Sequence, residues 1–121
     1  MSSVRAIRGA ITTSADHPDA IGEAVQELLV TMLERNSVDL ENVISVIFTA
    51  TTDLVSAFPA TAARSVGFGA VPLICASEIA VPGSMPRCIR VMMHVESHAD
   101  RDSIRHIYLR DAVSLRDDIA Q

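Results

Sequence analysis

The spacing of apolar residues predicts two helices. From Pro18 to Asn36, apolar residues recur at offsets of three, four, seven and eight residues, which is typical of a helix with one buried face. The predicted buried stripe consists of Ile21, Ala24, Val25, Leu28, Leu29, Met32 and Leu33. A second, shorter helix is predicted to begin at Pro59 and to end before Gly67, since proline favours a first turn and glycine the position beyond the last turn.

Shorter apolar runs, with two-residue alternation or with no polar interruption, predict five strands. These strands are expected at residues 4–13, 43–51, 71–75, 87–97 and 104–109. The run at 43–51 is almost entirely apolar, so we expect a central strand that is covered on both faces. Together with the helices, the order β-α-β-α-β-β-β predicts an α+β fold, in which a mixed β-sheet carries both helices on one face.

Arginine side chains interrupt the apolar faces of two predicted strands. Alternation places Arg8 on one face of the first strand, together with the small residues Ala6 and Ala10. In the strand at 87–97, Arg90 likewise projects from an apolar row. Such an arginine is either half of a structural ion pair or a ligand for an anion, and the alternation alone leaves both interpretations open.

Composition narrows the class of partner. The 121 residues fit one domain, and an apolar fraction of 49% is high for so short a chain, so part of the apolar surface is expected to contact another subunit. The net charge of −5 argues against nucleic acid, which is bound through many phosphate contacts on a basic face. The ten residues counted as Lys or Arg are all arginine, whose forked side chain suits carboxylates.

Several other classes of protein are disfavoured by single features. No apolar run approaches the roughly 20 residues of a membrane span, and no signal peptide is visible, so we expect a cytoplasmic protein without a membrane partner. Cys75 and Cys88 are too few for a disulfide scaffold and are expected to be reduced. His94 and His98 lie four residues apart on a predicted strand, which separates them by roughly 13 Å, so no metal site is expected.

Six separated segments, in order, resemble the AroH class of chorismate mutases, over a stretch from about Val4 to Arg116. The matching segments are RAIRGAIT (5–12), TDLVSAFPA (52–60), CASE (75–78), CIRVMMHV (88–95), IRHIYL (104–109) and SLR (114–116). The resemblance implies a homotrimer of pseudo-α/β-barrel form, with active sites between neighbouring subunits. It also implies that chorismate is the substrate, that prephenate is the product, and that the rearrangement uses no cofactor.

The resemblance implies roles for individual residues. Arg90 is expected to contact the ether oxygen of chorismate, where negative charge accumulates as the bond breaks. Glu78 is expected to accept a hydrogen bond from the ring hydroxyl and to orient Arg90 by its charge. Arg8 and Tyr108 are expected to bind one carboxylate of the substrate, and Arg64 the other. The structural alternatives are a solvated arginine on a helix surface for Arg64 and a half-buried ring for Tyr108.

Four further residues complete the implied site. Phe58 is expected to form an apolar wall, and Cys75 to line the cleft without acting as a nucleophile. Leu115 and Arg116 are expected to close the cleft from a tail that begins at about residue 114 and is expected to be mobile. The alternatives are that Phe58 packs in the core and that Leu115 and Arg116 belong to a frayed terminus.

Two functions other than catalysis are compatible with the same residues. The arginine cleft could serve a trimeric, non-catalytic sensor of an anionic metabolite, which needs only the carboxylate contacts of Arg8 and Tyr108. Alternatively, the arginines could form intersubunit salt bridges in an assembly module that has no concave pocket. An Arg90 side chain in the cleft favours the mutase, whereas one that is folded away favours the sensor.

Overall fold

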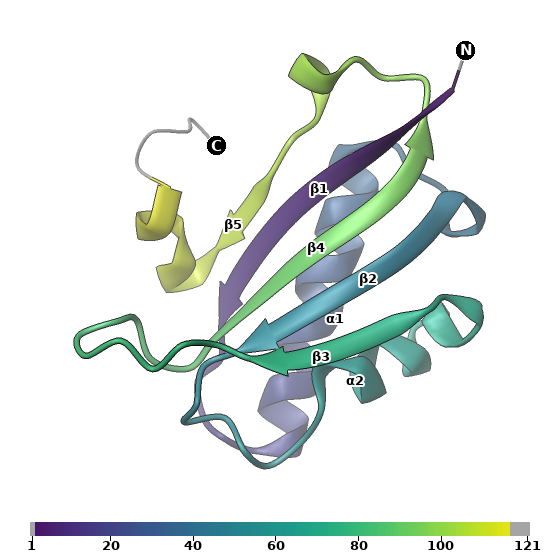
Figure 1. Cartoon of the computed structure of the whole chain (residues 1–121). Coiled ribbons are helices and arrows are strands. Elements are labelled where there is room, and N and C mark those ends of the chain that lie inside the picture. The colour runs from purple at the N-terminus through teal and green to yellow at the C-terminus, as the bar shows by residue number, and fades with distance from the viewer. Residues whose placement is uncertain (1, 117–121) are drawn as a thin grey trace.

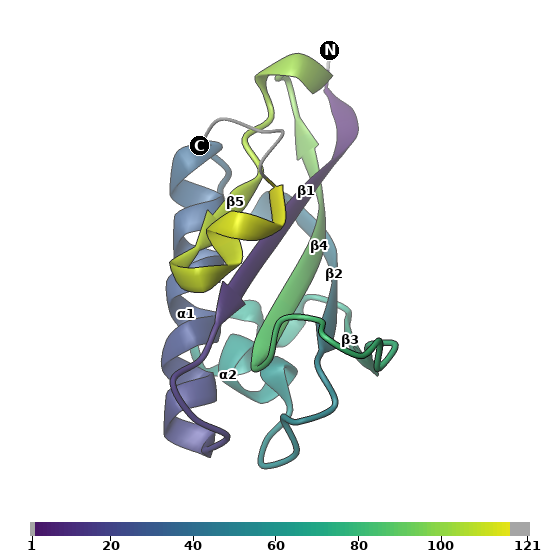
Figure 2. The same cartoon turned by 90° about the vertical axis from the view of Figure 1, so that its left-hand side faces the viewer.

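A five-stranded mixed sheet forms the centre of the computed structural model, which describes residues 2–116 (Figure 1). Its strands are β1 (Ser3–Thr12), β2 (Val43–Ala50), β3 (Leu73–Ser77), β4 (Cys88–Ser97) and β5 (Ile107–Leu109). They are arranged in the order β3-β2-β4-β1-β5, with β4 antiparallel to β1 and β2, and with both edge strands parallel to their neighbours. The helices α1 (Pro18–Arg35) and α2 (Pro59–Ser65) lie on one face of the sheet, which Figure 2 shows from the side. The predicted α+β fold is confirmed.

Local chemistry defines both ends of α1. The His17 ring nitrogen Nδ1 accepts a hydrogen bond from the Asp19 backbone N–H at 3.1 Å, and Pro18 occupies the first turn. Between its ends, the predicted apolar stripe faces the core: Leu33 is partly buried and the other members are buried. Asn36, where the predicted helix ends, caps its carboxyl end.

The shorter helix α2 also follows the prediction. It begins at Pro59, and Gly67 adopts the left-handed conformation beyond its end, with φ of 104°. Ala60 and Ala63 are buried on its inner side, where they join the hydrophobic core between the helices and the sheet. The small size of these two side chains lets the helix lie close to the strands.

Close packing of α1 on β1 depends on one glycine. Ile7 and Ile11 of β1 are fully buried in the core, and Gly9 lies between them on the same strand face. A Cβ atom at Gly9 would come within 2.6 Å of the Met32 sulfur and 3.1 Å of Leu28 Cδ1. The absence of a side chain at this position therefore allows the helix to approach the strand.

The opposite face of the sheet carries neither α1 nor α2, and we call it the open face (Figure 2). Ile47 of β2 and Ile74 of β3 are strand partners on this face and are 39% and 62% exposed. The prediction that both faces of the 43–51 strand are covered is therefore wrong within one chain, and the central strand of the sheet is β4. The physical reason is that both helices pack on the same side.

Three strands lie within one residue of their predicted bounds, and two, β3 and β5, differ by more. β3 begins two residues later than predicted, because the 3₁₀ helix η2 (Phe68–Ala70) and Pro72 precede it. β5 covers only residues 107–109 of the predicted 104–109. The Asn36 side chain binds both the N–H and the carbonyl of Arg105, and these two bonds keep the preceding residues out of the sheet.

Three further 3₁₀ helices connect or follow the strands: η1 (Leu40–Asn42), η3 (Arg101–Ser103) and η4 (Arg110–Arg116). The tail predicted from about residue 114 begins inside η4, and residues 117–121 lie outside the described part of the chain. Within residues 2–116, no helix has the length and apolar character that a membrane crossing requires.

We expect Gly9→Ala to destabilise the fold, because the added methyl group must displace Met32 from a packed core. The free energy of unfolding, measured by urea denaturation at fixed protein concentration, should fall by about 1–3 kcal/mol. Gly69→Ala is the matched control, since a Cβ atom there meets no other atom within 4 Å. Equal stability of the two variants would contradict the close approach of α1 to β1.

Candidate active site

The strand register brings three of the predicted site residues to the open face. Arg90 of β4 lies opposite Ala10 of β1 and Thr49 of β2, and Ala10 in turn lies opposite Tyr108 of β5. Partners across a sheet project their side chains to the same face, so Thr49, Arg90 and Tyr108 form one row. Arg8 belongs to the next row on the same face.

These side chains line a pocket of about 240 Å³. Arg8, Thr49, Arg90 and Tyr108 supply its polar side chains, and the apolar side chains of Ile47 and Met92 lie beside them. Two guanidinium groups and a phenol next to apolar surface suit a small anion with an apolar body. No carboxylate of residues 2–116 forms an ion pair with Arg8, so its charge is available to a ligand.

An ion pair with Glu78 orients Arg90. The Arg90 Nε lies 3.2 Å from Glu78 Oε2, and the Thr49 hydroxyl donates a hydrogen bond of 2.6 Å to the same oxygen. The Glu78 backbone N–H also donates to the Ala50 carbonyl at 2.9 Å, which fixes the carboxylate at the end of β2. The Arg90 side chain is 49% exposed and that of Glu78 17%, so the pair holds the guanidinium at its base and leaves terminal N–H groups for a ligand.

The Cys88 thiol lies next to this pair and is chemically inert. Burial raises its pKa to about 11, although the nearby charge of Arg90 acts in the opposite direction. The thiol is therefore neutral at pH 7, and it packs as an apolar group with Tyr108 and Ala112. Leu115 of η4 packs against the same cluster, which covers one end of the open face.

The remaining predicted residues lie away from this pocket. Phe58 and Cys75 line a separate cavity of about 410 Å³ at the carboxyl end of β2, and Phe58 is 70% exposed. Arg64 is exposed on α2, which lies behind the sheet in Figure 1, so the sheet separates Arg64 from Arg90. Arg116 ends η4, and its side chain lies outside the described part of the chain. One chain thus brings together only Arg8, Glu78, Arg90 and Tyr108.

Thr49 contributes to the site, although its place in the sequence does not predict this role. This residue lies in a run that we interpreted as an apolar strand, and its polar group gave no reason to depart from that interpretation. Only the register opposite Arg90 and the position of Glu78 reveal its role. A hydroxyl that donates to a carboxylate already paired with arginine lowers the cost of burying that carboxylate.

Two aspartates that fix the loop between β2 and α2 were also missed. Asp16 accepts hydrogen bonds from the backbone N–H groups of Val55 and Ser56, both at 3.0 Å. Asp53 accepts another, at 2.9 Å, from the backbone that leads into β4. Hydrogen bonds from Ser56 and Val55, chiefly from the Ser56 side chain, hold the pKa of Asp16 below its usual range, although desolvation opposes them. The loop that presents Phe58 is therefore tied at two points.

The fold and the pocket define the class of protein: a small α+β protein with an arginine-lined site for an anionic molecule on the open face of its sheet. Among residues 2–116, no group of three or more His, Cys, Asp or Glu side chains is placed to share a metal ion. The model of the family described as chorismate mutase type I matches residues 4–119, and the chain belongs to this family. Its function is that of a chorismate mutase, an isomerase.

Known relatives match nearly the whole chain. Chorismate mutase AroH of Thermus thermophilus is 53% identical over 117 residues, which cover 96% of each chain. Chorismate mutase AroH of Bacillus subtilis (strain 168) is 40% identical over 118 residues, 97% of this chain and 93% of that one. A solved chorismate mutase from Clostridium thermocellum is similar with a TM-score of 0.88 at 49% identity, covering 90% of this chain and 97% of that chain. The resemblance to the AroH class is confirmed.

We expect Asp16 to hold its loop until the pH falls below the usual carboxyl range. Because its pKa is lowered, the charged acceptor persists near pH 4, where ordinary aspartates are about half protonated. Hydrogen-exchange protection factors of the Val55 and Ser56 amides should stay constant from pH 7 to about pH 4 and should fall at lower pH. In Asp16→Ala both amides should lose protection across the whole range, and retained protection would disprove this anchor.

Proposed function

We propose that the chain rearranges chorismate to prephenate, a step of phenylalanine and tyrosine synthesis, with Arg90 as the residue that stabilises the transition state. One observation carries this assignment: Arg90 stands half exposed in the same pocket as Arg8 and Tyr108 and is held at its base by Glu78. A cation in this position can contact the body of a ligand whose carboxylate the other two side chains bind.

The chemistry explains why a fixed cation is sufficient. The ether carbon–oxygen bond of chorismate breaks while a carbon–carbon bond forms in the same molecule, and no proton is transferred. Negative charge accumulates on the ether oxygen as its bond lengthens. A guanidinium fixed at that oxygen stabilises the transition state more than the ground state, by on the order of 3 kcal/mol. Arg90 therefore acts through its charge and its N–H donors, without a nucleophile or a general base.

The other residues hold the substrate in its reactive shape. Arg8 and Tyr108 bind one carboxylate, and Glu78 accepts a hydrogen bond from the ring hydroxyl. Chorismate is a flexible dianion, so fixing both of its ends favours the compact, chair-like conformer in which the reacting carbons approach. Arg64 binds the second carboxylate. Since the sheet separates Arg64 from Arg90 in one chain, the Arg64 that reaches the substrate belongs to a neighbouring chain.

Exposed apolar side chains support a site between subunits. Phe58 is 70% exposed at the end of its loop, and Ile74 is 62% exposed on the open face. Val4, on the same face of β1 as Arg8, is 59% exposed. Large apolar side chains of this kind are buried when chains associate. Within residues 2–116, the cluster at one end of the open face is covered by η4 and by Met85 of the loop before β4.

We infer a homotrimer in which three equivalent clefts form between neighbouring chains. The open face of one chain supplies Arg8, Arg90 and Tyr108, and the next chain supplies Phe58 and Arg64. Cys75 lines the edge of the cleft, and Leu115 and Arg116 close it from η4. The whole of residues 1–121 serves as one catalytic domain, and the protein acts in the cytoplasm.

The two alternative functions have less support. A non-catalytic sensor needs the carboxylate contacts alone, whereas here Arg90 lines the same pocket as Arg8 and Tyr108. An assembly module needs no pocket, whereas the open face has one of about 240 Å³. This volume is below the range of complete ligand sites, as expected if a neighbouring chain supplies one wall of the pocket.

We expect Arg90→Ala to lower kcat by at least about 100-fold, because the variant lacks the donor at the developing charge. The loss of chorismate absorbance in the ultraviolet measures the rate. Arg101→Ala is the matched control, since Arg101 is an exposed arginine on η3, outside the pocket. A kcat of Arg90→Ala within tenfold of the wild type would rule out the proposed role.

A further inference from the structure

Tyr108 lies on the shortest strand of the sheet. β5 has three residues, pairs only with β1, and forms an edge. Three strand pairs define its register: Gly9 with Ile107, Ala10 with Tyr108, and Ile11 with Leu109. So short an edge strand is weakly held by its own backbone hydrogen bonds. The position of the Tyr108 side chain therefore depends on what fixes the two ends of β5.

The amino end of β5 is tied to α1 and β1. Asn36, at the end of α1, donates from Nδ2 to the Arg105 carbonyl at 2.9 Å and accepts from the Arg105 N–H at 2.8 Å. The His106 ring nitrogen Nδ1 accepts a hydrogen bond of 3.0 Å from the Arg8 backbone N–H. These side-chain contacts hold residues 105 and 106, which come before the strand pairing that begins at residue 107.

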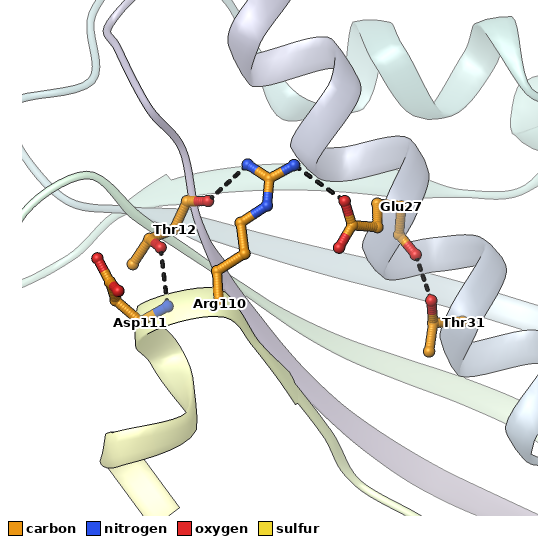
Figure 3. Close-up of polar contacts among 5 residues, drawn as sticks. All are labelled: Thr12, Glu27, Thr31, Arg110 and Asp111. Atoms are coloured by element: carbon orange, nitrogen blue, oxygen red, sulfur yellow. Dashed lines mark hydrogen bonds and ion pairs between the residues drawn. The ribbon is translucent and has the colours of Figure 1, made fainter.

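The carboxyl end of β5 is tied through one guanidinium, drawn in Figure 3. Arg110 donates from one terminal nitrogen to the Thr12 carbonyl at 3.1 Å and from the other to Glu27 Oε1 at 2.9 Å. The next residue, Asp111, donates its backbone N–H to the Thr12 hydroxyl at 3.3 Å. The Arg110 fork thus joins the end of β5 to the end of β1 and to the middle of α1.

The backbone at Arg110 requires this support. Its φ of 54° is left-handed, a conformation that residues with a Cβ atom adopt at a cost and keep only where surrounding contacts hold it. This turn directs the chain from β5 into η4, whose Ala112 and Leu115 pack in the same cluster as Tyr108. Release of the guanidinium would allow the turn to relax and would loosen both the Tyr108 strand and its cover.

We propose that Glu27 and Arg110 are positioning residues for Tyr108, although Glu27 lies on α1, behind the sheet and away from the pocket. Glu27 holds the Arg110 fork, the fork holds the left-handed turn, and the turn fixes the strand that carries the phenol. This inference rests on the proposed function, in which Tyr108 binds a carboxylate of chorismate. An exposed ion pair contributes little to stability, so the effect falls on substrate binding rather than on melting temperature.

Kinetics test the coupling to Tyr108. We expect Glu27→Ala to raise KM for chorismate by about fivefold or more, with kcat within about twofold, because carboxylate binding is lost from ground state and transition state alike. Glu27→Gln, which keeps the acceptor oxygen, should have an intermediate effect. Glu34→Ala removes an exposed carboxylate two turns along α1 and should leave KM unchanged. In a Tyr108→Phe background, Glu27→Ala should change KM by less than about twofold, since there is no hydroxyl left to misplace.

Fluorescence tests the same coupling without activity. Tyr108 is the only tyrosine and the chain has no tryptophan, so emission excited at about 280 nm reports on this side chain, which is 7% exposed. Acrylamide should quench Glu27→Ala at least about twice as strongly as the wild type or Glu34→Ala, with all three proteins folded by circular dichroism.

Two results would overturn the inference: unchanged quenching and KM in Glu27→Ala, or a rise in KM that persists in full in the Tyr108→Phe background. The failure of the proposed function is separate. If the wild type does not convert chorismate while Glu27→Ala still exposes Tyr108 to acrylamide, the anchoring of Tyr108 stands and its assigned role in binding chorismate falls.

Discussion

The site depends on a guanidinium that is held at its base and left open at its tip. Arg90 stands on an apolar sheet face, where an unpaired charge would be costly, and Glu78 offsets that cost through Nε. Thr49 in turn satisfies the carboxylate, so the contact is fixed from two strands and one loop. Because the charge is neutralised from one side only, its remaining donors can act on a ligand. The pair therefore offsets the cost of placing a charge on this face while the terminal N–H groups of Arg90 stay accessible.

The one-sided placement of the helices has a consequence for the whole assembly. α1 and α2 bury one face of the sheet, so Ile47, Ile74, Arg8 and Arg90 are left on the other. A second set of implied site residues, Phe58 and Arg64, belongs to the helix side and its connecting loop. Surfaces that cannot meet within a chain can meet between copies of it, and the high apolar fraction of the sequence is consistent with such contacts.

Local rules predicted a large part of the fold. The apolar stripe of α1, the start of α2 at Pro59 and the position of Gly67 beyond its end follow from helix periodicity and capping, and all agree with the structure. Alternation also placed Arg8 and Arg90 on apolar strand faces, although it could not show that both lie on the same face of the sheet. That fact depends on the β1–β4 register, which pairs residues 76 to 94 positions apart in the sequence.

The features that sequence analysis missed depend on distant contacts. β5 is shorter than its apolar run because Asn36 binds the Arg105 backbone from 69 positions away. The turn into η4 requires Arg110 at positive φ, and this conformation is uncommon for residues other than glycine, so the sequence does not predict it. Asp16 stabilises a loop that begins more than 30 residues later. In each case, a polar side chain acts on a backbone group that becomes its neighbour only after folding.

The central claim is that each active site joins the open face of one chain to the helix side of the next, and subunit mixing tests it most directly. Arg90→Ala and Arg64→Ala are refolded together in equal amounts, and the rate is measured at chorismate well below KM. Half of the sites then carry the native Arg90, and half of these face a chain with the native Arg64. We predict about one quarter of the wild-type rate, well above the mean of the two separate variants. A mixture no more active than that mean would contradict a site shared between chains.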